Sequence, residues 1–424
     1  MPAVCLILKV HEPPRLRHFS FFDIGESNTY IDEHATAAHL NEIATRCYLP
    51  ATRILLKQIR EFRGDFRLSI LLSGVTLTHF ERTQPELLAQ FGALAESGCV
   101  EFICEPFYHS LSFLFSKPEF REQIALQRET LCRLLGGSAA TLHDPTGSYT
   151  NELAAEAEAT GFTVMLSSMA TGGAREVRSL NRVYQPAAYP NLKLLFAPRL
   201  FADTVARFSA HPRASEKPPT ATAFAHLLTQ QQGDVLTLSA DLQAFADHPP
   251  GEAGALEFLH DLPGAVLAYK GLHFQTPAQA AKSTPACGSI SIPGYPSWEA
   301  AEQTCHELIG NEMQKDAIHG LYLMEKEVKA HPDPAILTQW RLLQVSDHFR
   351  YMGAKPVNER EVHPLSSPYQ SPYDAYINYM NILTDFSERL ATPCPIKTFP
   401  SSKSMKVLRL LADGPERLER PARS

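Results

Sequence analysis

The chain has 424 residues, of which 44% are hydrophobic and 20% charged, and its formal net charge is -7. These are values of a globular protein, and the length suits one large domain with an accessory region. Because no lysine- or arginine-rich run accompanies the negative charge, we expect no nucleic-acid partner. The apolar run at residues 3–8 is too short for a signal sequence, and no stretch approaches the roughly 18 apolar residues of a membrane span. The sequence therefore predicts a cytoplasmic protein without a membrane partner.

Short apolar runs alternate with helical patterns over the first two thirds of the chain. Five runs are typical of buried strands: residues 4–10, 66–74, 99–106, 162–168 and 234–242. Residues 85–98, 117–137 and 151–161 have helical spacing, and Gly136 and Gly137 predict the end of the second of these helices. The eight cysteines are scattered without a CxxC pair, which indicates reduced core thiols.

The strand–helix alternation predicts an α/β fold with a mainly parallel sheet, open or closed. About six or seven such units precede residue 285, which favours a (β/α) barrel. From about residue 298 the pattern is helical, without strands. We therefore expect a barrel domain at residues 1–285, a helical domain at residues 286–390 and a flexible tail at residues 391–424.

Polar side chains follow several of the predicted strands. They comprise His11 after the first strand, Glu105 and His109 after the third, His143 and Asp144 in ATLHDPTGSYT, and Asp241 and His248 late in the barrel. The carboxyl ends of parallel barrel strands meet at one mouth, so these groups are expected to gather there. Carboxylates, histidines and aromatic residues together suit sugar binding and acid–base chemistry. Taken singly, His11 also suits a core histidine and Asp241 a helix N-cap.

Several motifs resemble glycoside hydrolase family 57, the α-amylase-like branch, in the order in which that family has them. They are LKVHEPPRLRHFSFFDIGES, CEPFYHSLSFLFSKPEF, DLQAFADH, IGNEMQ, WRLLQVSDHFRYM and SPYDAYINYMNILTDF. The resemblance implies an incomplete seven-stranded (β/α) barrel followed by a helical domain, and retaining hydrolysis of α-glucans such as malto-oligosaccharides. We expect no cofactor and no metal, and the sequence leaves the oligomeric state open.

The resemblance also implies roles for individual residues. His11, Glu105, His109 and His248 match substrate-site positions, and Asp241 matches the general acid/base. Three positions depart from the family pattern: Glu12 stands in place of glutamine, and Gln243 and Asp247 in place of glutamate.

The position of the catalytic nucleophile carries the main departure. The family has a glutamate at the end of the fourth strand, and this chain has Thr146 there, three residues before Tyr149. A retaining glycosidase needs a carboxylate on each side of the scissile bond, and a threonine hydroxyl cannot replace one. Asp144 is a possible surrogate because residues i and i+2 of a strand face one side, but it would lie about 6–7 Å lower. The alternative is that Asp144 forms a turn.

Two further features have competing interpretations. Trp298, at a helix start, is assigned to substrate binding, whereas Trp340 is expected in the core of a helix. Asp347 and His348 look like a metal or catalytic pair, but without a third ligand nearby a structural hydrogen bond is preferred. Three functions were weighed: an α-glucan-active enzyme, a non-catalytic glucan-binding or regulatory protein, and a metal-dependent deacetylase, disfavoured because no HxxxH follows a strand.

Overall fold

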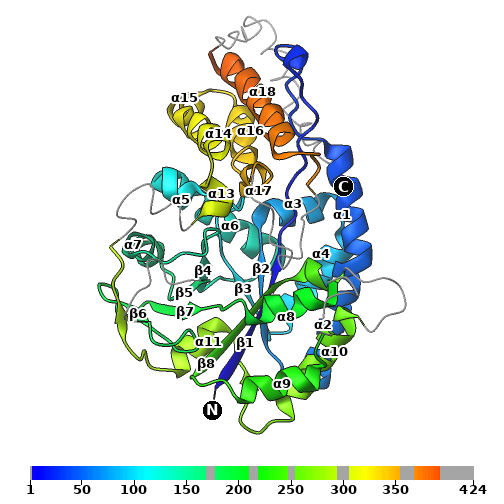
Figure 1. The fold of residues 1–424 in the computed structure, drawn as a ribbon, viewed down its shortest axis with the longest axis vertical. Helices are drawn as coiled ribbons and strands as arrows, with labels where there is room; N and C mark the ends of the chain where they lie inside the picture. The colour runs from blue at the N-terminus through cyan, green and yellow to red at the C-terminus, as the bar shows by residue number, and fades with distance from the viewer. Residues whose placement is uncertain are drawn as a thin grey trace, which may run out of the picture.

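The fold is seen in a computed structural model, which describes residues 2–168, 177–209, 218–246, 254–293, 305–353 and 367–391. Its central element is a curved sheet of parallel strands (Figure 1). The strands are β1 (Ala3–Val10), β2 (Leu68–Leu72), β3 (Val100–Ile103), β4 (Thr141–His143), β5 (Val164–Ser167), β7 (Lys193–Phe196) and β8 (Val235–Asp241). The short strand β9 (His273–Phe274) also pairs with β1, and β6 (Gln185–Pro186) pairs with β10 (Ser289–Ile290).

The sheet runs in the order β8-β1-β2-β3-β4-β5-β7. A parallel bridge between Cys104 and Leu142 joins β3 to β4 and so connects the two halves of the sheet. Among the described residues no ladder closes β7 onto β8; instead the carbonyl of Asn181 accepts from the backbone N–H groups of Asp234 and Val235. The predicted incomplete seven-stranded barrel is therefore confirmed.

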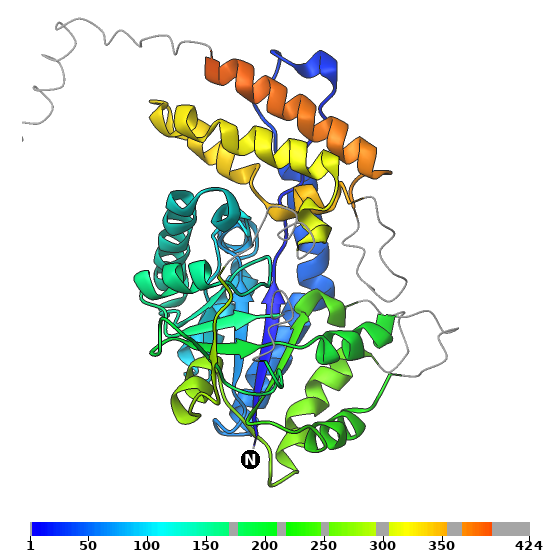
Figure 2. The same cartoon turned by 60° about the vertical axis from the view of Figure 1, so that its left-hand side comes forward.

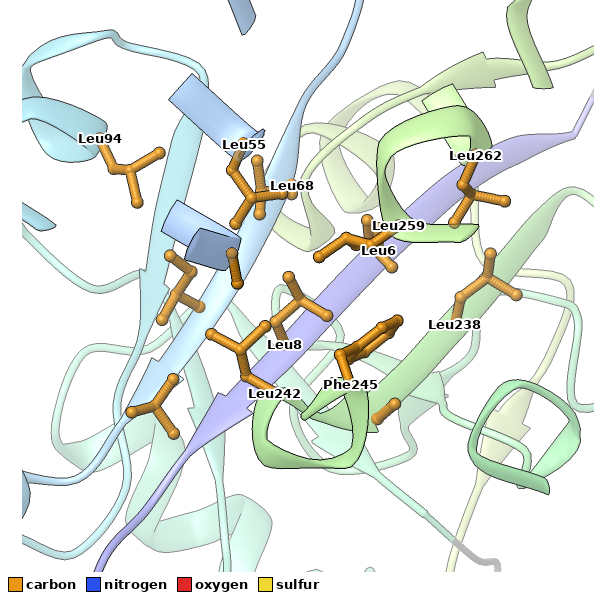
Figure 3. Close-up of a cluster of buried hydrophobic side chains, with 14 of the residues drawn as sticks. Leu6, Leu8, Leu55, Leu68, Leu94, Leu238, Leu242, Phe245, Leu259 and Leu262 are labelled. Carbon is orange, nitrogen blue, oxygen red and sulfur yellow. The ribbon is translucent and has the colours of Figure 1, made fainter. Parts of the chain in front are cut away.

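Strand β1 shows why the sheet is buried on both faces. Leu6 and Leu8 point outward into a core formed with the surrounding helices (Figure 3). This core also contains Leu55 of α2, Leu259 of α10, and Leu242 and Phe245, which follow β8. Cys5 and Ile7 point the other way, into the barrel interior. Successive side chains of a strand point to opposite faces of the sheet. A strand that is covered on both faces is therefore apolar along its whole length.

Helices follow most strands and cover the outside of the barrel. They are α1 (Glu33–Ile43), α2 (Leu49–Glu61), α3 (Gly74–Thr83), α4 (Pro85–Glu96), α5 (Ser112–Phe115), α6 (Lys117–Leu135), α7 (Asn151–Ala159), α8 (Leu200–Ser209), α9 (Ala221–Thr229), α10 (Ala255–Leu267) and α11 (Pro277–Ser283). Helix α6 begins where Ser116 accepts a hydrogen bond from the Glu119 backbone N–H, and it ends at Gly136, whose φ of +69° is the left-handed value that glycine permits.

The later part of the chain forms a helical layer over the carboxyl ends of the barrel strands (Figure 1). Its helices are α13 (His306–Ile309), α14 (Glu312–Leu323), α15 (Glu325–Ala330), α16 (Pro334–Leu342), α17 (Ser346–Arg350) and α18 (Pro372–Ala391). Trp340 lies fully buried in its core and donates its indole N–H to the Leu321 carbonyl at 2.9 Å, as the core assignment of this residue predicts.

The segment between β1 and α1 also belongs to the core of this helical layer. Leu16, Phe19 and Tyr30 pack with Phe386 and other residues of α18, and Figure 2 shows the segment rising from β1 to lie beside that helix. Asn378 fixes the contact, because its side-chain oxygen accepts from the Phe19 backbone N–H at 2.7 Å. The helical layer is therefore built from two distant parts of the sequence.

Two sequence expectations concern the chain as a whole. The cysteines at the described positions are all free thiols: Cys5, Cys47, Cys99, Cys104 and Cys305 are buried, and Cys132 and Cys287 are exposed. Within the described ranges, none of the helices has both the length and the apolar character needed to cross a membrane.

Candidate active site

His11 lies just beyond the end of β1 and is held from two sides. Its Nδ1 is 2.7 Å from the Ser73 hydroxyl oxygen, and its Nε2 donates to Oδ2 of Asp347 in α17 at 2.7 Å. Burial opposes the charged imidazolium, but the carboxylates of Asp347, Glu105 and Glu12 outweigh it and raise the pKa of His11. The first predicted site residue is thus linked directly to the helical layer.

Glu105 follows β3 and is completely buried. Its Oε2 accepts from Nδ1 of His109 at 2.7 Å and lies 3.8 Å from Nδ1 of His143, whereas Oε1 has no hydrogen-bond partner among the described residues. Burial alone would raise the pKa of this carboxyl, but the His109 and His143 imidazoles lower it below its usual value. An anionic carboxylate with one open acceptor therefore lies beneath the barrel mouth.

His109 joins these two groups. Its ring stacks on His11 with centroids 4.2 Å apart and an interplanar angle of 27°. Its backbone has a φ of +51°, the left-handed region that histidine, asparagine and aspartate enter more readily than most residues. The backbone N–H donates to the Pro106 carbonyl at 2.7 Å, which tightens the turn after β3. The chain thus bends sharply here, and the bend brings the imidazole back over Glu105.

Thr146 and Asp144 form a tight turn after β4. The Thr146 hydroxyl donates to Oδ2 of Asp144 at 2.5 Å, and its backbone N–H donates to the same oxygen at 3.1 Å. Asp144 is only 2% exposed, and its Oδ1 has no partner within the described part of the chain. Burial raises the pKa of Asp144 to about 6, against the lowering effect of the two Thr146 hydrogen bonds. The turn geometry is that of an aspartate whose side chain accepts from the backbone two residues on.

Asp241 is the last residue of β8 and is exposed. It precedes the short 3₁₀ helix at Leu242–Phe245, but its side chain makes no capping hydrogen bond to that helix. The parallel register pairs Asp241 with Lys9 on β1, two residues before His11, so both predicted residues reach the same end of the sheet. A solvent-facing carboxylate at a strand end remains available to a ligand. The other two predicted residues, His248 and Trp298, lie outside the described residues.

Two carboxylates at the site, those of Glu12 and Asp347, are not among the site residues that the sequence predicts. Glu12 is 1% exposed, accepts from the Tyr48 hydroxyl, and lies 2.8 Å from Nε2 of His39. Asp347 was assigned to a structural hydrogen bond, and its partner is His11, 336 positions away. The available signals were the position of Glu12 next to His11 and the occurrence of Asp347 in the motif WRLLQVSDHFRYM.

The arrangement favours a ligand that can donate several hydrogen bonds. The open acceptors are Oε1 of Glu105 and Oδ1 of Asp144, and an unpartnered buried acceptor costs free energy until a donor reaches it. The hydroxyl groups of a sugar are donors of this kind.

The chain is similar to several known proteins. It is 28% identical over 398 residues to a predicted alpha-amylase of Methanocaldococcus jannaschii, a match that covers 89% of this chain and 82% of that protein. In structure it resembles a family 57 branching enzyme of Thermococcus kodakaraensis, crystallised with glucose and additives, with a TM-score of 0.63 and 13% identity over 92% of this chain and 90% of that one. It also resembles the 4-alpha-glucanotransferase of Thermococcus litoralis, with a TM-score of 0.57 and 15% identity over 82% of this chain, but it spans only 56% of that enzyme.

The structural similarities, at these identities, support the barrel fold. The family assignment rests on a separate finding, because residues 5–293 match the family model described as Glycosyl hydrolase family 57. This match extends over more than half of the sequence and covers the strands of the barrel except the first two residues of β1. The chain belongs to glycosyl hydrolase family 57.

Proposed function

We propose that this protein binds α-glucans, including malto-oligosaccharides, at the barrel mouth near His11, Glu105 and Asp241, and hydrolyses them very slowly or not at all. The relatives named above support the ligand class, since one is named for amylase activity, one for glucanotransferase activity and one for branching activity. The exposed carboxylate of Asp241 at the end of β8 supports binding of a polyhydroxylated ligand, because a carboxylate accepts hydrogen bonds from hydroxyl groups.

The hydrogen bond from Thr146 to Asp144 carries the catalytic half of the proposal. A retaining mechanism requires one carboxylate to attack the anomeric carbon and a second to donate and remove a proton, with the two about 5–5.5 Å apart. Thr146 has no carboxylate, and its hydroxyl is directed at its own neighbour. Asp241 can supply acid/base chemistry but has no nucleophile opposite it at the matched position.

A second candidate is a slow hydrolase that uses Asp144 as its nucleophile. Its unpartnered Oδ1 and its pKa near 6 favour this reading, since the group is ionised in part at neutral pH. Two observations oppose a nucleophilic role, because the attacking oxygen must reach a sugar carbon. Asp144 is only 2% exposed, and its Oδ2 already accepts hydrogen bonds from Thr146. We therefore prefer glucan binding as the principal function.

Isothermal titration calorimetry with maltoheptaose, alongside cellohexaose as a β-linked control, tests the proposal. We expect saturable heat with the α-glucan only, and release of reducing ends barely above the uncatalysed rate. Absence of binding at millimolar maltoheptaose by a folded sample would contradict the binding proposal. Brisk turnover of maltodextrin would contradict the catalytic one.

A further inference from the structure

We propose that His11, Glu105 and His109 form a binding site for one divalent transition-metal cation, with Zn²⁺ as the representative ion. The site shares His11 and Glu105 with the proposed glucan site, but the inference does not require a glucan to bind. One nitrogen from each imidazole and one oxygen of the Glu105 carboxylate lie within 4.8 Å of one another, and they are the group of potential metal ligands found among the described residues. The three residues come from the ends of two strands, β1 and β3.

The separation of the three groups is close to what an ion requires. Zinc bonds to imidazole nitrogen and carboxylate oxygen are about 2.0–2.2 Å long, so ligand atoms around a tetrahedral ion lie roughly 3.3–3.5 Å apart. Rotation of the two rings about their Cβ–Cγ bonds changes the nitrogen positions by distances of this order without moving the backbone. The site therefore needs side-chain adjustment and no change of fold.

Glu105 provides an independent reason to expect a cation. The residue is completely buried, yet its Oε1 has no hydrogen-bond partner within the described ranges. A buried acceptor without a donor is costly, and buried carboxylates are commonly paired or bound to metals. Oε2 of this carboxylate accepts from His109 Nδ1, so a cation at this point replaces the shared proton by direct bonds to both groups.

His11 has the surroundings of a metal-binding histidine. Ligating imidazoles almost always donate their other N–H to a carboxylate or carbonyl, which fixes the tautomer and the ring orientation. Here Nε2 of His11 faces Oδ2 of the buried Asp347 at 2.7 Å. That bond leaves Nδ1, now 2.7 Å from the Ser73 hydroxyl, as the nitrogen whose lone pair can turn toward a cation.

The donor set selects the class of ion. Two imidazoles and one carboxylate suit Zn²⁺ and other first-row divalent ions, and three protein ligands leave room for solvent. Ca²⁺ and Mg²⁺ prefer sets made of oxygen. The sequence predicts no metal, and these ligands are hard to recognise in it because the fold brings them together across 98 positions from His11 to His109.

Metal binding is measured on the full chain after chelator treatment and desalting, without glucan. Competition with a chromophoric chelator is expected to show about one Zn²⁺ per chain, and Co²⁺ is expected to give visible absorption typical of nitrogen and oxygen ligation. Zn²⁺ should also raise the melting temperature, because a ligand that binds the folded state stabilises it. No saturable binding of Zn²⁺ or Co²⁺ up to about 1 mM overturns the proposal.

Substitutions identify the ligands. Glu105→Gln preserves shape, and His109→Asn suits the left-handed backbone, so each removes a ligand with little strain. Each should weaken Zn²⁺ binding by on the order of 100-fold or more, and Asp347→Asn by roughly 10- to 100-fold through loss of ring orientation. His39→Gln is the matched control, because His39 contacts Glu12 and lies outside the ligand group.

Circular dichroism of each variant checks that it is folded. If a ligand variant does not fold, ¹⁵N chemical shifts of the wild-type imidazoles give the same answer, because the largest changes on Zn²⁺ addition should be at His11 and His109. Zn²⁺ affinity that is equal in Glu105→Gln, His109→Asn and wild type overturns the assignment. Calorimetry with maltoheptaose on the metal-free protein reports on the glucan proposal separately, so failure of one proposal is distinguishable from failure of the other.

Discussion

The hydroxyl of Thr146 donates to the carboxylate of Asp144 over 2.5 Å, so the residue at the position that we propose for the family's nucleophile is bonded to its own turn. The same turn receives the Thr146 backbone N–H, and Gly147 follows with a φ of +65°. Threonine at this position therefore both lacks a carboxylate and stabilises a local conformation that holds Asp144 in the interior.

Replacing Thr146 by glutamate should restore part of the missing catalytic pair. We expect maltodextrin hydrolysis to rise by on the order of 10²-fold or more, because a carboxylate at that position can attack the sugar while Asp241 acts as acid/base. Reducing-end assays measure the gain. Thr146→Gln is the matched control and should show none, and Asp241→Asn added to the Thr146→Glu protein should abolish it. A gain that survives Asp241→Asn would contradict the role assigned to Asp241.

Asp144→Asn should separate a structural role from a catalytic one. The amide oxygen can still accept from Thr146, but it carries no charge. Since burial raises the folded-state pKa of Asp144 to about 6, above its ordinary value of 3.8, the carboxyl favours folding below about pH 4 and this advantage is lost as the pH rises through 6. The free energy of unfolding of the variant relative to wild type should therefore increase between pH 4 and pH 7, by about 3 kcal/mol at most.

Turnover gives the second test of Asp144. If the residue is structural, the weak hydrolysis of the natural protein should be the same in wild type and Asp144→Asn. Rapid natural turnover that disappears in Asp144→Asn would make Asp144 the nucleophile and would contradict our interpretation of Thr146.

His79 should make the protein sensitive to acid. It is buried on α3, and burial lowers its pKa from 6.5 to about 4. The unfolded chain therefore binds more protons between these values, and stability falls as the pH drops from about 6.5 to about 4, by roughly 3 kcal/mol for this group. Urea denaturation across this range should show a smaller pH dependence in His79→Gln. An unchanged slope would show that other groups dominate acid unfolding.

The ion pair between Arg341 and Glu119 should couple the helical layer to the barrel. Nε and a terminal nitrogen of Arg341 in α16 donate to the two oxygens of buried Glu119 in α6 at 2.8 and 3.1 Å. Arg341→Lys cannot keep both bonds. Removing one partner of a buried pair typically costs about 3–5 kcal/mol, and the cost here should be smaller because Lys329 Nζ also lies 3.0 Å from Glu119. Thermal unfolding should show the loss for Arg341→Met and a smaller one for Arg341→Lys. Arg53→Met, which breaks an exposed pair with Glu86, should cost less than about 1 kcal/mol.

Five strands of the barrel could be predicted from local sequence patterns, whereas β4 and β7 are not among the predicted runs and the seven-stranded count came from the family resemblance. Residues 4–10 and 234–242 are apolar runs ended by polar groups, and the structure has β1 and β8 there. The helix predicted at residues 117–137 is α6, and Gly136, one of the two glycines that predict its end, is its C-cap. Such signals act over a few residues, and one sequence is enough to detect them.

The site could be predicted only in part because its contacts are distant along the chain. A strand-end rule places His11 and Glu105 at one mouth, but nothing local indicates that Asp347 reaches His11 from the helical layer. The turn at Asp144 was foreseen as an alternative, whereas its hydrogen bond to Thr146 depends on side-chain rotamers that sequence does not specify. The positions of His248 and Trp298 fall outside the described residues and stay predictions.

Truncation of this protein is limited by one contact, in which Leu16, Phe19 and Tyr30 pack against α18. The family match stops at residue 293, yet a fragment ending there would expose three large side chains that now pack with α18 and its neighbouring helices. Such a fragment is expected to aggregate or to recruit a chaperone, because a newly exposed apolar cluster has no other partner. During synthesis the same cluster stays uncovered until α18 has emerged from the ribosome, so the first residues made are among the last to be buried.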